Sequence, residues 1–560
     1  MTTHRVVDHK LLNFASHIDD NTIEQAKQTA SMPFVHPHVA LMPDAHSGKG
    51  SAIGTVIPTI DAVIPAAVGV DIGCGMIAAR TEFSATDIQG RDLAALRSAI
   101  ETAIPLSPGN YNDTLARFPF TAGRITDLEH LASDGGIDLS HSPKWREQLG
   151  SLGGGNHFIE LCLDQDDRVW LFLHSGSRGV GNKIAQKHIR IAQKLMKRWW
   201  IDLPNPDLAY LPQGTREFSE YLRDLNWAQR FAFENRAEMM DRYMWVFAAW
   251  MGYARLDQPR TAGDFEVERI NTHHNYTRKE HHGGREVWLT RKGAIDAHNG
   301  VMGLIPGSMG TRSYVVRGKG NPAGLCSAPH GAGRRFSRNE ARRRFTADDL
   351  AQRMRGIEYR HGEQWVDEIP DAYKDIDVVM ADAASLIEIE HELRQVLNVK
   401  GTRSWAEGSG PTSDNEVGHG STPDVVSIPR ALPHNHFGPL IRLASRPARS
   451  RSAQARSPAS TAAIAITVVL AVGDRSFQRF LATSAFLPDE WTSVSKIERP
   501  GVTGPAGAWP DEVRPVYRLP GIVVTGELPE PLPLPLPLPK SPPLDEEPVD
   551  ESPLDDDPLP

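Results

Sequence analysis

The alternation of short apolar runs with amphipathic stretches, and the point where it stops, most constrains what this chain can fold into. Four apolar runs typical of buried strands occur before Gly401, at residues 39–45, 62–73, 168–176 and 378–384. Between them lie stretches such as residues 182–200, where Ile184, Ile191 and Leu195 recur at helical spacing. Strands that alternate with helices are typical of mixed folds. We therefore predict one compact α/β (α+β) domain over residues 1–401.

Composition changes after residue 401. A Gly/Ser-rich piece is followed by an Arg/Ser-rich piece at residues 442–456, by the repeat PLPLPLPLP at 531–539, and by an acidic end at 544–560. Such segments bury too little apolar surface to offset the conformational entropy of ordering the chain, and the Pro-Leu repeat favours polyproline II. We predict a disordered extension over residues 402–560.

Charge and cysteine content exclude several classes of protein. The formal net charge of −9 gives no global basic footprint, so contact with RNA requires a local patch. Two basic segments are candidates, residues 183–198 and 334–345. Three cysteines are too few for a disulfide framework in 560 residues. The apolar run at 462–472 falls short of the roughly 18 residues of a membrane span, and the first residues lack an apolar signal core. We expect a cytoplasmic protein that does not enter membranes.

Several short motifs carry side chains that bind transition metals. The candidate ligands are Asp71 and Cys74 in GVDIGCG, His157 in GGGNHFIE, His174 in LFLHSGSRGVG, and His273 and His274 in INTHHNYT. A carboxylate, a thiolate and several imidazoles could hold one or two ions. Taken alone, a histidine at the end of a strand is more often a hydrogen-bonded structural side chain than a metal ligand, and Asp-x-x-Cys is no standard zinc signature.

Glycine-rich turns form a second theme. The segments HSGSRGVGNK, IPGSMGTRSY and HGAGRR could direct backbone N–H groups at an anion such as a phosphate. Within the last of them, His330 is followed by Gly331, Ala332 and Gly333, which suggests a bound anion, although a turn with an incidental histidine fits the same residues. No Walker A motif is present, and no G-x-G-x-x-G follows a strand-like run, which argues against P-loop and Rossmann folds.

The ordered set of motifs resembles the RtcB family of RNA-splicing ligases, especially its bacterial branch. The motifs are MPDAHSGKG, VIPAAVGVDIGCGM, GSLGGGNHFIEL, HSGSRGVGN, HHNY, TRKGA, IPGSMG, HGAGRRFSR and AYKDID…VLNVKG. They run from about residue 10 to Gly401, essentially one whole family domain with a fold of its own. Family chains usually end near VKG, so the residues after Gly401 depart from the pattern and put the match of Lys400 in question.

The resemblance implies both a reaction and its residues. Family members join RNA ends carrying a 3′-phosphate or 2′,3′-cyclic phosphate to 5′-hydroxyl ends, using GTP and two Mn²⁺ ions, through a His–GMP adduct and an RNA-3′-pp-5′-G end. The histidine that takes up GMP matches His330. The implied metal ligands are Asp71, Cys74, His157, His174 and His274, with Asp44 near the metals. The implied GTP contacts are Asn156, Phe158, Glu160, Ser308, Ala332, Arg334, Tyr373 and Lys400.

Three points stay open at this stage. Cysteine and histidine ligands suit zinc better than manganese, so manganese follows from the resemblance and not from the ligand types. A metal-dependent phosphodiesterase that opens cyclic phosphates without ligation would use the same site. An inactive RNA-binding adaptor is a further alternative. The intact metal-ligand positions of this chain count against it, because an adaptor without activity would not need them.

Overall fold

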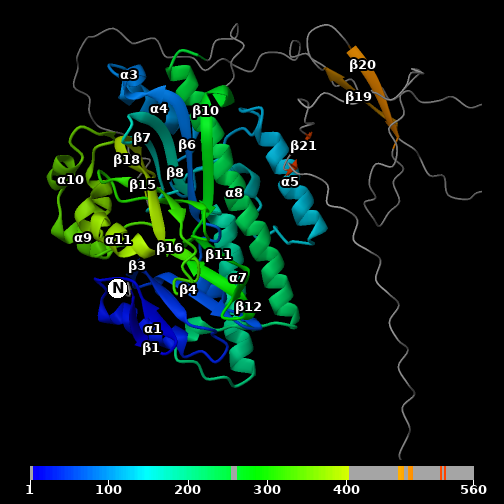
Figure 1. Cartoon of the computed structure of the whole chain (residues 1–560), viewed down its shortest axis with the longest axis vertical. Helices are drawn as coiled ribbons and strands as arrows, with labels where there is room; N and C mark the ends of the chain where they lie inside the picture. The colour runs from blue at the N-terminus through cyan, green and yellow to red at the C-terminus, as the bar shows by residue number, and fades with distance from the viewer. Residues whose placement is uncertain are drawn as a thin grey trace, which may run out of the picture. The chain divides into compact units, whose positions relative to one another are not determined.

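The structure, a computed structural model, describes residues 4–253 and 262–402 together with four short strands further along the chain. The chain divides into two units, Met1–Asn435 and His436–Pro560. All the candidate site residues belong to the first unit, which combines helices with two large sheets (Figure 1). The predicted mixed α/β (α+β) class is therefore confirmed.

Two sheets form the framework of the first unit. In the six-stranded sheet the order is β1 (Arg5–Asp8), β2 (Leu11–Asn13), β3 (Val39–His46), β4 (Ile53–Thr59), β12 (Arg285–Lys292), β11 (Asn275–His282). In the eight-stranded sheet the order is β10 (Glu266–His273), β6 (Gly75–Ser84), β8 (Arg168–Ser175), β7 (Phe158–Leu163), β18 (Ile387–Val399), β15 (Ser313–Gly318), β14 (Met302–Ile305), with β17 (Glu358–Tyr359) beside β18. Two small pairs join β5 (Ala62–Val63) to β9 (Leu211–Pro212) and β13 (Ala294–Asp296) to β16 (Ser327–Pro329).

Helices surround these sheets, and the longest of them lies along the eight-stranded one (Figure 1). The α-helices are α1 (Asp20–Ala30), α2 (Pro65–Val68), α3 (Ala85–Ile88), α4 (Leu93–Ala103), α5 (Thr121–Asp134), α6 (Trp145–Gln148), α7 (Arg178–Arg198), α8 (Arg216–Trp250), α9 (Arg338–Arg344), α10 (Ala347–Arg353) and α11 (Ile376–Asp382). Short 3₁₀ helices are η1 (Pro206–Leu208), η2 (Ala262–Phe265), η3 (Glu363–Glu368), η4 (Pro370–Ala372) and η5 (Ala383–Ser385).

Helix α8 is buried over most of its length, and it organises the largest apolar core. Met240 and Phe247 of α8 pack with Leu161 of β7, Leu171 of β8 and Ile100 of α4. Burial of such side chains contributes about 1.5–3 kcal/mol each relative to exposure. Because one helix packs against both β6 and β8, it holds the ends of these strands in a fixed relation.

Local sequence patterns predict some elements correctly and others wrongly. The strands expected at 39–45 and 168–176 are β3 and β8. The helix expected at 182–200 is α7, which begins four residues earlier and ends two residues earlier than expected. The strand expected at 378–384 is wrong: helix α11 covers most of it, because Asp375 caps the segment and Ile376, Val379 and Met380 bury one helical face. In the run at 62–73 only Ala62 and Val63 form a strand, since Pro65 starts helix α2.

The predicted disordered extension, residues 402–560, lies almost wholly outside the described residues, and its boundary stays a prediction. Within it the structure describes two strand pairs that the prediction did not include. β19 (Ala465–Ala471) pairs with β20 (Phe477–Thr483), and β21 (Tyr517–Leu519) pairs with β22 (Ile522–Val524). Across the described residues, no helix has the length and apolar character that crossing a membrane demands.

Arg236, in the middle of α8, is fully buried and ties three segments of the first unit together. Its Nη1 donates to the carbonyl oxygens of Gly73 at 2.7 Å and Ser175 at 3.1 Å, and its Nε donates to Asn271 Oδ1 at 2.8 Å. These acceptors belong to the turn before β6, to the end of β8 and to β10. One guanidinium therefore satisfies polar groups that water does not reach.

We predict that Arg236→Met destabilises the first unit by about 3 kcal/mol or more, because several buried acceptors lose their donor at about 1–3 kcal/mol each. Urea unfolding followed by tryptophan fluorescence measures the change. Arg230→Met on the same helix is the matched control, since Arg230 is 52% exposed and pairs with Glu234 at the surface. Equal unfolding midpoints for the two variants would contradict the structural role of Arg236.

Candidate functional site

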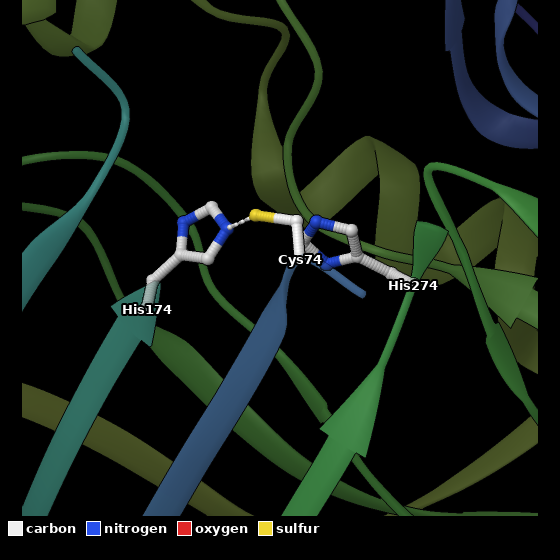
Figure 2. A group of neighbouring side chains, drawn as sticks. All are labelled: Cys74, His174 and His274. Carbon is white, nitrogen blue, oxygen red and sulfur yellow. Dashed lines mark hydrogen bonds between the residues drawn. The ribbon is translucent and has the colours of Figure 1, made fainter. Parts of the chain in front are cut away.

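The metal-ligand candidates come together where strands of the eight-stranded sheet begin or end. Cys74 directly precedes β6, His157 directly precedes β7, His174 is the penultimate residue of β8, and His274 lies between β10 and β11. Figure 2 shows Cys74 between His174 and His274, each on a different segment of the chain. β6 pairs with both β8 and β10, and β7 pairs with β8, so strand pairing alone brings the four positions together.

Distances between the side chains are those of a ligand cluster. Cys74 Sγ lies 3.2 Å from His174 Nε2 and 3.4 Å from His157 Nε2. His157 Nε2 in turn lies 3.1 Å from Asp71 Oδ2. Two groups of possible ligands result, Cys74 with His174 and His274, and Cys74 with Asp71 and His157. Cys74 belongs to both groups.

The surroundings prepare the imidazoles for coordination. His157 Nδ1 lies 2.9 Å from the Leu152 carbonyl oxygen, and His174 Nδ1 lies 3.2 Å from that of Asn156. An Nδ1–H that donates to a carbonyl leaves the Nε2 lone pair free for a metal. Burial and the neighbouring histidines lower the pKa of His174 and of His274 well below the ordinary value, which keeps both rings neutral.

The two acidic ligand candidates differ in charge. Burial raises the pKa of the Cys74 thiol, and the carboxylate of Asp71 raises it further. Burial also acts to raise the pKa of Asp71, but the hydrogen bond to His157 and the charges of His157 and Arg178 outweigh it, so that this pKa is lowered. A thiol in this position becomes a thiolate when a cation binds, because the cation replaces the lost hydration of the charge.

His330 lies beside the cluster and is held by Asp44. Its ring is 14% exposed, its Nδ1 lies 2.6 Å from Asp44 Oδ2, and its backbone N–H donates to the same oxygen at 3.1 Å. The His330 and His274 rings are 4.8 Å apart between centroids. The chain reaches this geometry through Gly333, whose φ of +70° is unfavourable for other residues and where a Cβ would lie 2.3 Å from the Asp44 carbonyl oxygen. The glycine-rich turn thus lets the backbone after His330 approach the backbone of Asp44 closely.

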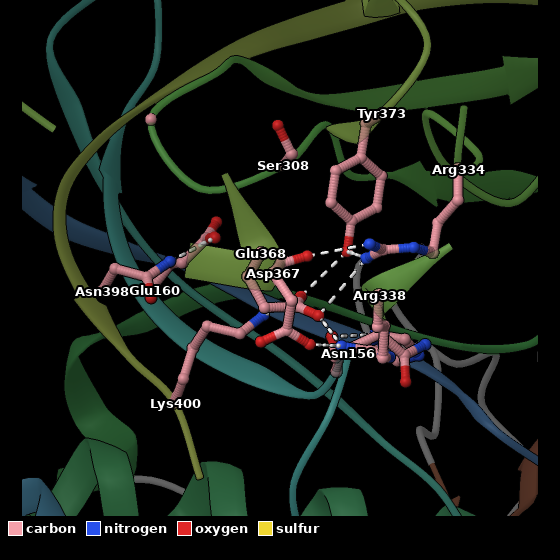
Figure 3. A network of polar contacts seen from close by, with 12 residues as sticks. Asn156, Glu160, Ser308, Arg334, Arg338, Asp367, Glu368, Tyr373, Asn398 and Lys400 are labelled. Carbon is pink, nitrogen blue, oxygen red and sulfur yellow. Dashed lines mark hydrogen bonds and ion pairs between the residues drawn. The ribbon is translucent and has the colours of Figure 1, made fainter. Parts of the chain in front are cut away.

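A polar network occupies the neighbouring region (Figure 3). Lys400 Nζ donates to Glu368 Oε2 at 2.7 Å, the Tyr373 hydroxyl donates to the same oxygen at 2.8 Å, and Arg334 Nη1 donates to the Tyr373 hydroxyl at 3.0 Å. Arg338 also pairs with Glu368. Burial alone would raise the pKa of Glu368, but the positive charges of Lys400, Arg338 and Arg334 lower it to about 2. The network brings together three of the predicted GTP contacts, Arg334, Tyr373 and Lys400.

Glu160 forms a separate part of the same region. It is buried in β7 and accepts a hydrogen bond from Asn398 Nδ2 at 3.0 Å. Burial raises the pKa of Glu160 to about 8, even though the charge of Lys400 acts in the opposite direction. Phe158, two residues earlier, is also buried, and its ring centroid lies 6.0 Å from Lys400 Nζ.

The remaining predicted contacts are arranged around this region. Ala332 is buried in the turn after His330. The Ser308 carbonyl accepts a hydrogen bond from Gln395 at 2.8 Å, while the Ser308 hydroxyl lies 3.2 Å from Thr311 Oγ1. The side chain of Asn156 is exposed. His273, the alternative to His274, lies outside both ligand groups, and its Nδ1 is 2.9 Å from the Gly73 carbonyl oxygen.

Sequence reasoning did not find several residues that shape this site. Asp367 and Glu368, which bind Arg338 and Lys400, stand in no motif that signals a ligand site. Arg338 falls in the basic segment 334–345, which we considered for RNA. In the structure Arg338 and Arg342 pair with Asp367, and Arg343 and Arg344 pair with Glu340. Most arginines of this segment therefore form ion pairs within the protein.

We predict that Glu160→Gln removes a pH dependence of stability. The unfolded chain releases the Glu160 proton near the ordinary pKa of 4.5, whereas the folded protein holds it to about pH 8. A raised pKa stabilises the fold fully below pH 4.5, and this contribution is lost as the pH rises toward 8.

The measurement is the free energy of unfolding of both proteins at pH 5 and pH 8. Relative to Glu160→Gln, the wild-type protein should lose at least about 1 kcal/mol between these values. Glu147→Gln, which changes a carboxylate of α6 outside this region, is the control and should follow the wild type. Parallel pH profiles for the wild type and Glu160→Gln would show that Glu160 is ionised in the folded protein.

Comparison with known proteins identifies the family of this chain. The family model described as tRNA-splicing ligase RtcB matches residues 25–401, which include all the candidate ligands and His330. The RNA-splicing ligase RtcB of Escherichia coli K12 is 45% identical over 397 residues, which cover 69% of this chain and 95% of that protein. The tRNA-splicing ligase RtcB of Pyrobaculum aerophilum is 30% identical over 429 residues, 64% of this chain and 87% of that protein. The chain therefore belongs to the RtcB family of RNA ligases.

Proposed function

We propose that this protein is a GTP- and Mn²⁺-dependent RNA ligase that joins 3′-phosphate or 2′,3′-cyclic phosphate ends to 5′-hydroxyl ends. The observation that carries the proposal is the imidazole of His330, which is paired with Asp44 and lies beside the cluster of metal-ligand side chains. The three cysteines of the chain are all free thiols, and we propose the reducing cytoplasm as the compartment of this protein.

The residues present fit the implied metal ions. Asp71, Cys74, His157, His174 and His274 would hold two ions, with Cys74 between them because it belongs to both ligand groups. When bound, the ions would offset the negative charge of the phosphates. Thiolate and imidazole ligands favour zinc over manganese in affinity, so manganese is proposed from the family relationship and zinc would compete for the same ligands.

His330 is the proposed nucleophile. Asp44 Oδ2 lies 2.6 Å from His330 Nδ1, so the carboxylate would favour a proton on Nδ1 and leave the lone pair on Nε2 to attack the α-phosphorus of GTP. A P–N bond forms, the bond to the leaving oxygen breaks, and pyrophosphate departs. Asp44 also stabilises the positive charge that develops on the ring during the attack.

The polar network is proposed to hold the nucleotide. Arg334, Lys400 and Tyr373 all contact Glu368, so a guanylate would compete with this carboxylate for their donors. Protonated Glu160 could donate a hydrogen bond to the base as well as accept one. Asn156, Phe158, Ser308 and Ala332 complete the proposed pocket.

RNA then enters the reaction. Its 3′-phosphate attacks the phosphorus of the His–GMP adduct, and His330 leaves as a good, easily protonated leaving group. The product is an RNA-3′-pp-5′-G end, which the 5′-hydroxyl of the second RNA attacks with release of GMP. A cyclic phosphate must first be hydrolysed to the 3′-phosphate.

We predict that Cys74→Ala lowers the metal content from two ions per chain to one or none, and abolishes ligation. Without the shared thiolate, no negative charge would offset the repulsion between the two cations. Metal content after dialysis against Mn²⁺ is measured by mass spectrometry. Cys162→Ala is the matched control, because Cys162 is also buried but belongs to neither ligand group. Unchanged metal content in Cys74→Ala would show that Cys74 is not a metal ligand and only fills space in the core.

We predict further that His330→Ala takes up no label from α-labelled GTP, yet still joins RNA supplied with a preformed 3′-pp-5′-G end. The first step needs the imidazole, whereas the last step does not. The wild-type label should be labile to acid and stable to alkali, as a P–N bond is. His281→Ala, which changes an exposed histidine of β11, is the control and should be labelled normally.

The same assay tests the alternative function. Opening of cyclic phosphates without consumption of GTP, and without joined product, would identify a phosphodiesterase. Label on Lys400 instead of His330 would overturn the proposed nucleophile.

A further inference from the structure

The C-terminal end of α7 presents a basic and aromatic surface that the proposed reaction does not use. We call it the α7-end patch; its exposed members are Arg190, Lys194, Lys197, Arg198, Trp199 and Trp200. Residues 190–202 contain four cationic side chains and one carboxylate, Asp202, which gives a local charge of +3 in a chain whose net charge is −9. The patch is a local exception to the acidic character of the protein.

Trp200 is the most unusual residue of the patch. Its side chain is 94% exposed, the largest exposed fraction among the large apolar side chains of the described residues. Its φ of +54° lies in the left-handed region, where glycine is the usual residue after a helix. Neither burial nor backbone conformation thus favours a tryptophan here. An exposed aromatic ring held in an unfavourable conformation is typical of a binding surface.

The cations of the patch are not used inside the fold, in contrast with the other basic residues of α7. Lys183 donates to the His141 carbonyl oxygen, and Lys187 pairs with Asp224. Within residues 4–253 and 262–402, we find no ion pair for Arg190, Lys194, Lys197 or Arg198. Their charge is therefore available to a partner.

The opposite end of α7 touches the metal-ligand cluster. The N–H of Ser177, which precedes the helix, donates to Asp71 Oδ1 at 3.1 Å, and Arg178 Nη1 lies 3.2 Å from His157 Nδ1. Helix α7 has 21 residues, so it spans about 31 Å. A strand with stacked bases advances about 3.4 Å per nucleotide, so about nine nucleotides reach from one end of α7 to the other. Figure 1 shows α7 as one continuous helix beside α8.

We propose that the α7-end patch binds single-stranded RNA about nine nucleotides from the end that reacts. The proposal rests on the proposed function, because it takes RNA as the substrate. The four cations would contact phosphates, and the Trp200 ring would stack on a base. Stacking requires an unpaired base, so single-stranded RNA fits the patch better than a duplex.

The main experiment measures RNA binding by fluorescence anisotropy, in the absence of GTP, with the full chain. Trp200→Ala should weaken the affinity for a single-stranded RNA of about 20 nucleotides by at least about fivefold, and should not change the affinity for one of about five nucleotides. Lys197→Gln should reduce the slope of log affinity against log salt concentration by about one.

Two matched controls accompany these variants. Trp245→Ala changes a tryptophan that is 42% exposed on α8, and Lys27→Gln changes an exposed lysine of α1. Both should bind the long RNA as the wild type does. Labelling from GTP should be normal in Trp200→Ala, because the patch lies far from His330, and the KM for long RNA should rise while kcat is unchanged.

Equal affinity of Trp200→Ala and Trp245→Ala for the long RNA would overturn the proposal. So would a loss, in Trp200→Ala, of binding to vesicles containing anionic lipid with RNA binding intact, since the patch would then serve a membrane surface. Failure of the proposed function appears differently: the wild-type protein would take no label from GTP, whereas the anisotropy measurements would still decide whether the patch binds RNA.

Discussion

The structure depends on holding a thiol, a carboxylate and three imidazoles within contact distance of one another at one edge of a sheet. Such groups do not come together without cost, because burial disfavours every charge among them. The pairing of β6 with β8 and β10, and of β8 with β7, fixes the backbone positions from which they project. Arg236 satisfies carbonyl groups at the same edge. A bound cation would supply the charge that makes the arrangement favourable.

The site lies where the two large sheets meet. His274 stands on the connection between β10 of the eight-stranded sheet and β11 of the six-stranded sheet. Asp44 belongs to β3 of the six-stranded sheet, and His330 follows β16 of a separate strand pair. The cluster of metal-ligand candidates and His330 with Asp44 thus come from different parts of the framework. Their relation is set by packing between these parts and by Gly333, whose missing Cβ lets the turn approach Asp44.

Much of the site could be predicted because its residues stand in long, ordered motifs. Those motifs named His330, the ligand candidates and three members of the polar network, Arg334, Tyr373 and Lys400, as candidates. Without the motifs, spacing alone could not choose between His273 and His274, because adjacent residues of an extended segment point to opposite faces and either could face the cluster. Asp367, Glu368 and Arg338 were missed since their importance arises from ion pairs between segments far apart in the sequence.

The sequence by itself determined the mixed α/β class and the long amphipathic helix α7, because hydrophobic periodicity is a local property, and its ordered motifs named the candidate site residues. Tertiary structure alone decided that 376–382 is a helix, that Arg338 and Arg342 of the basic segment 334–345 pair with Asp367, and that the charges at the end of α7 stay exposed. The physical reason is that a side chain's electrostatic role depends on which distant charges surround it, and only the folded chain brings them near.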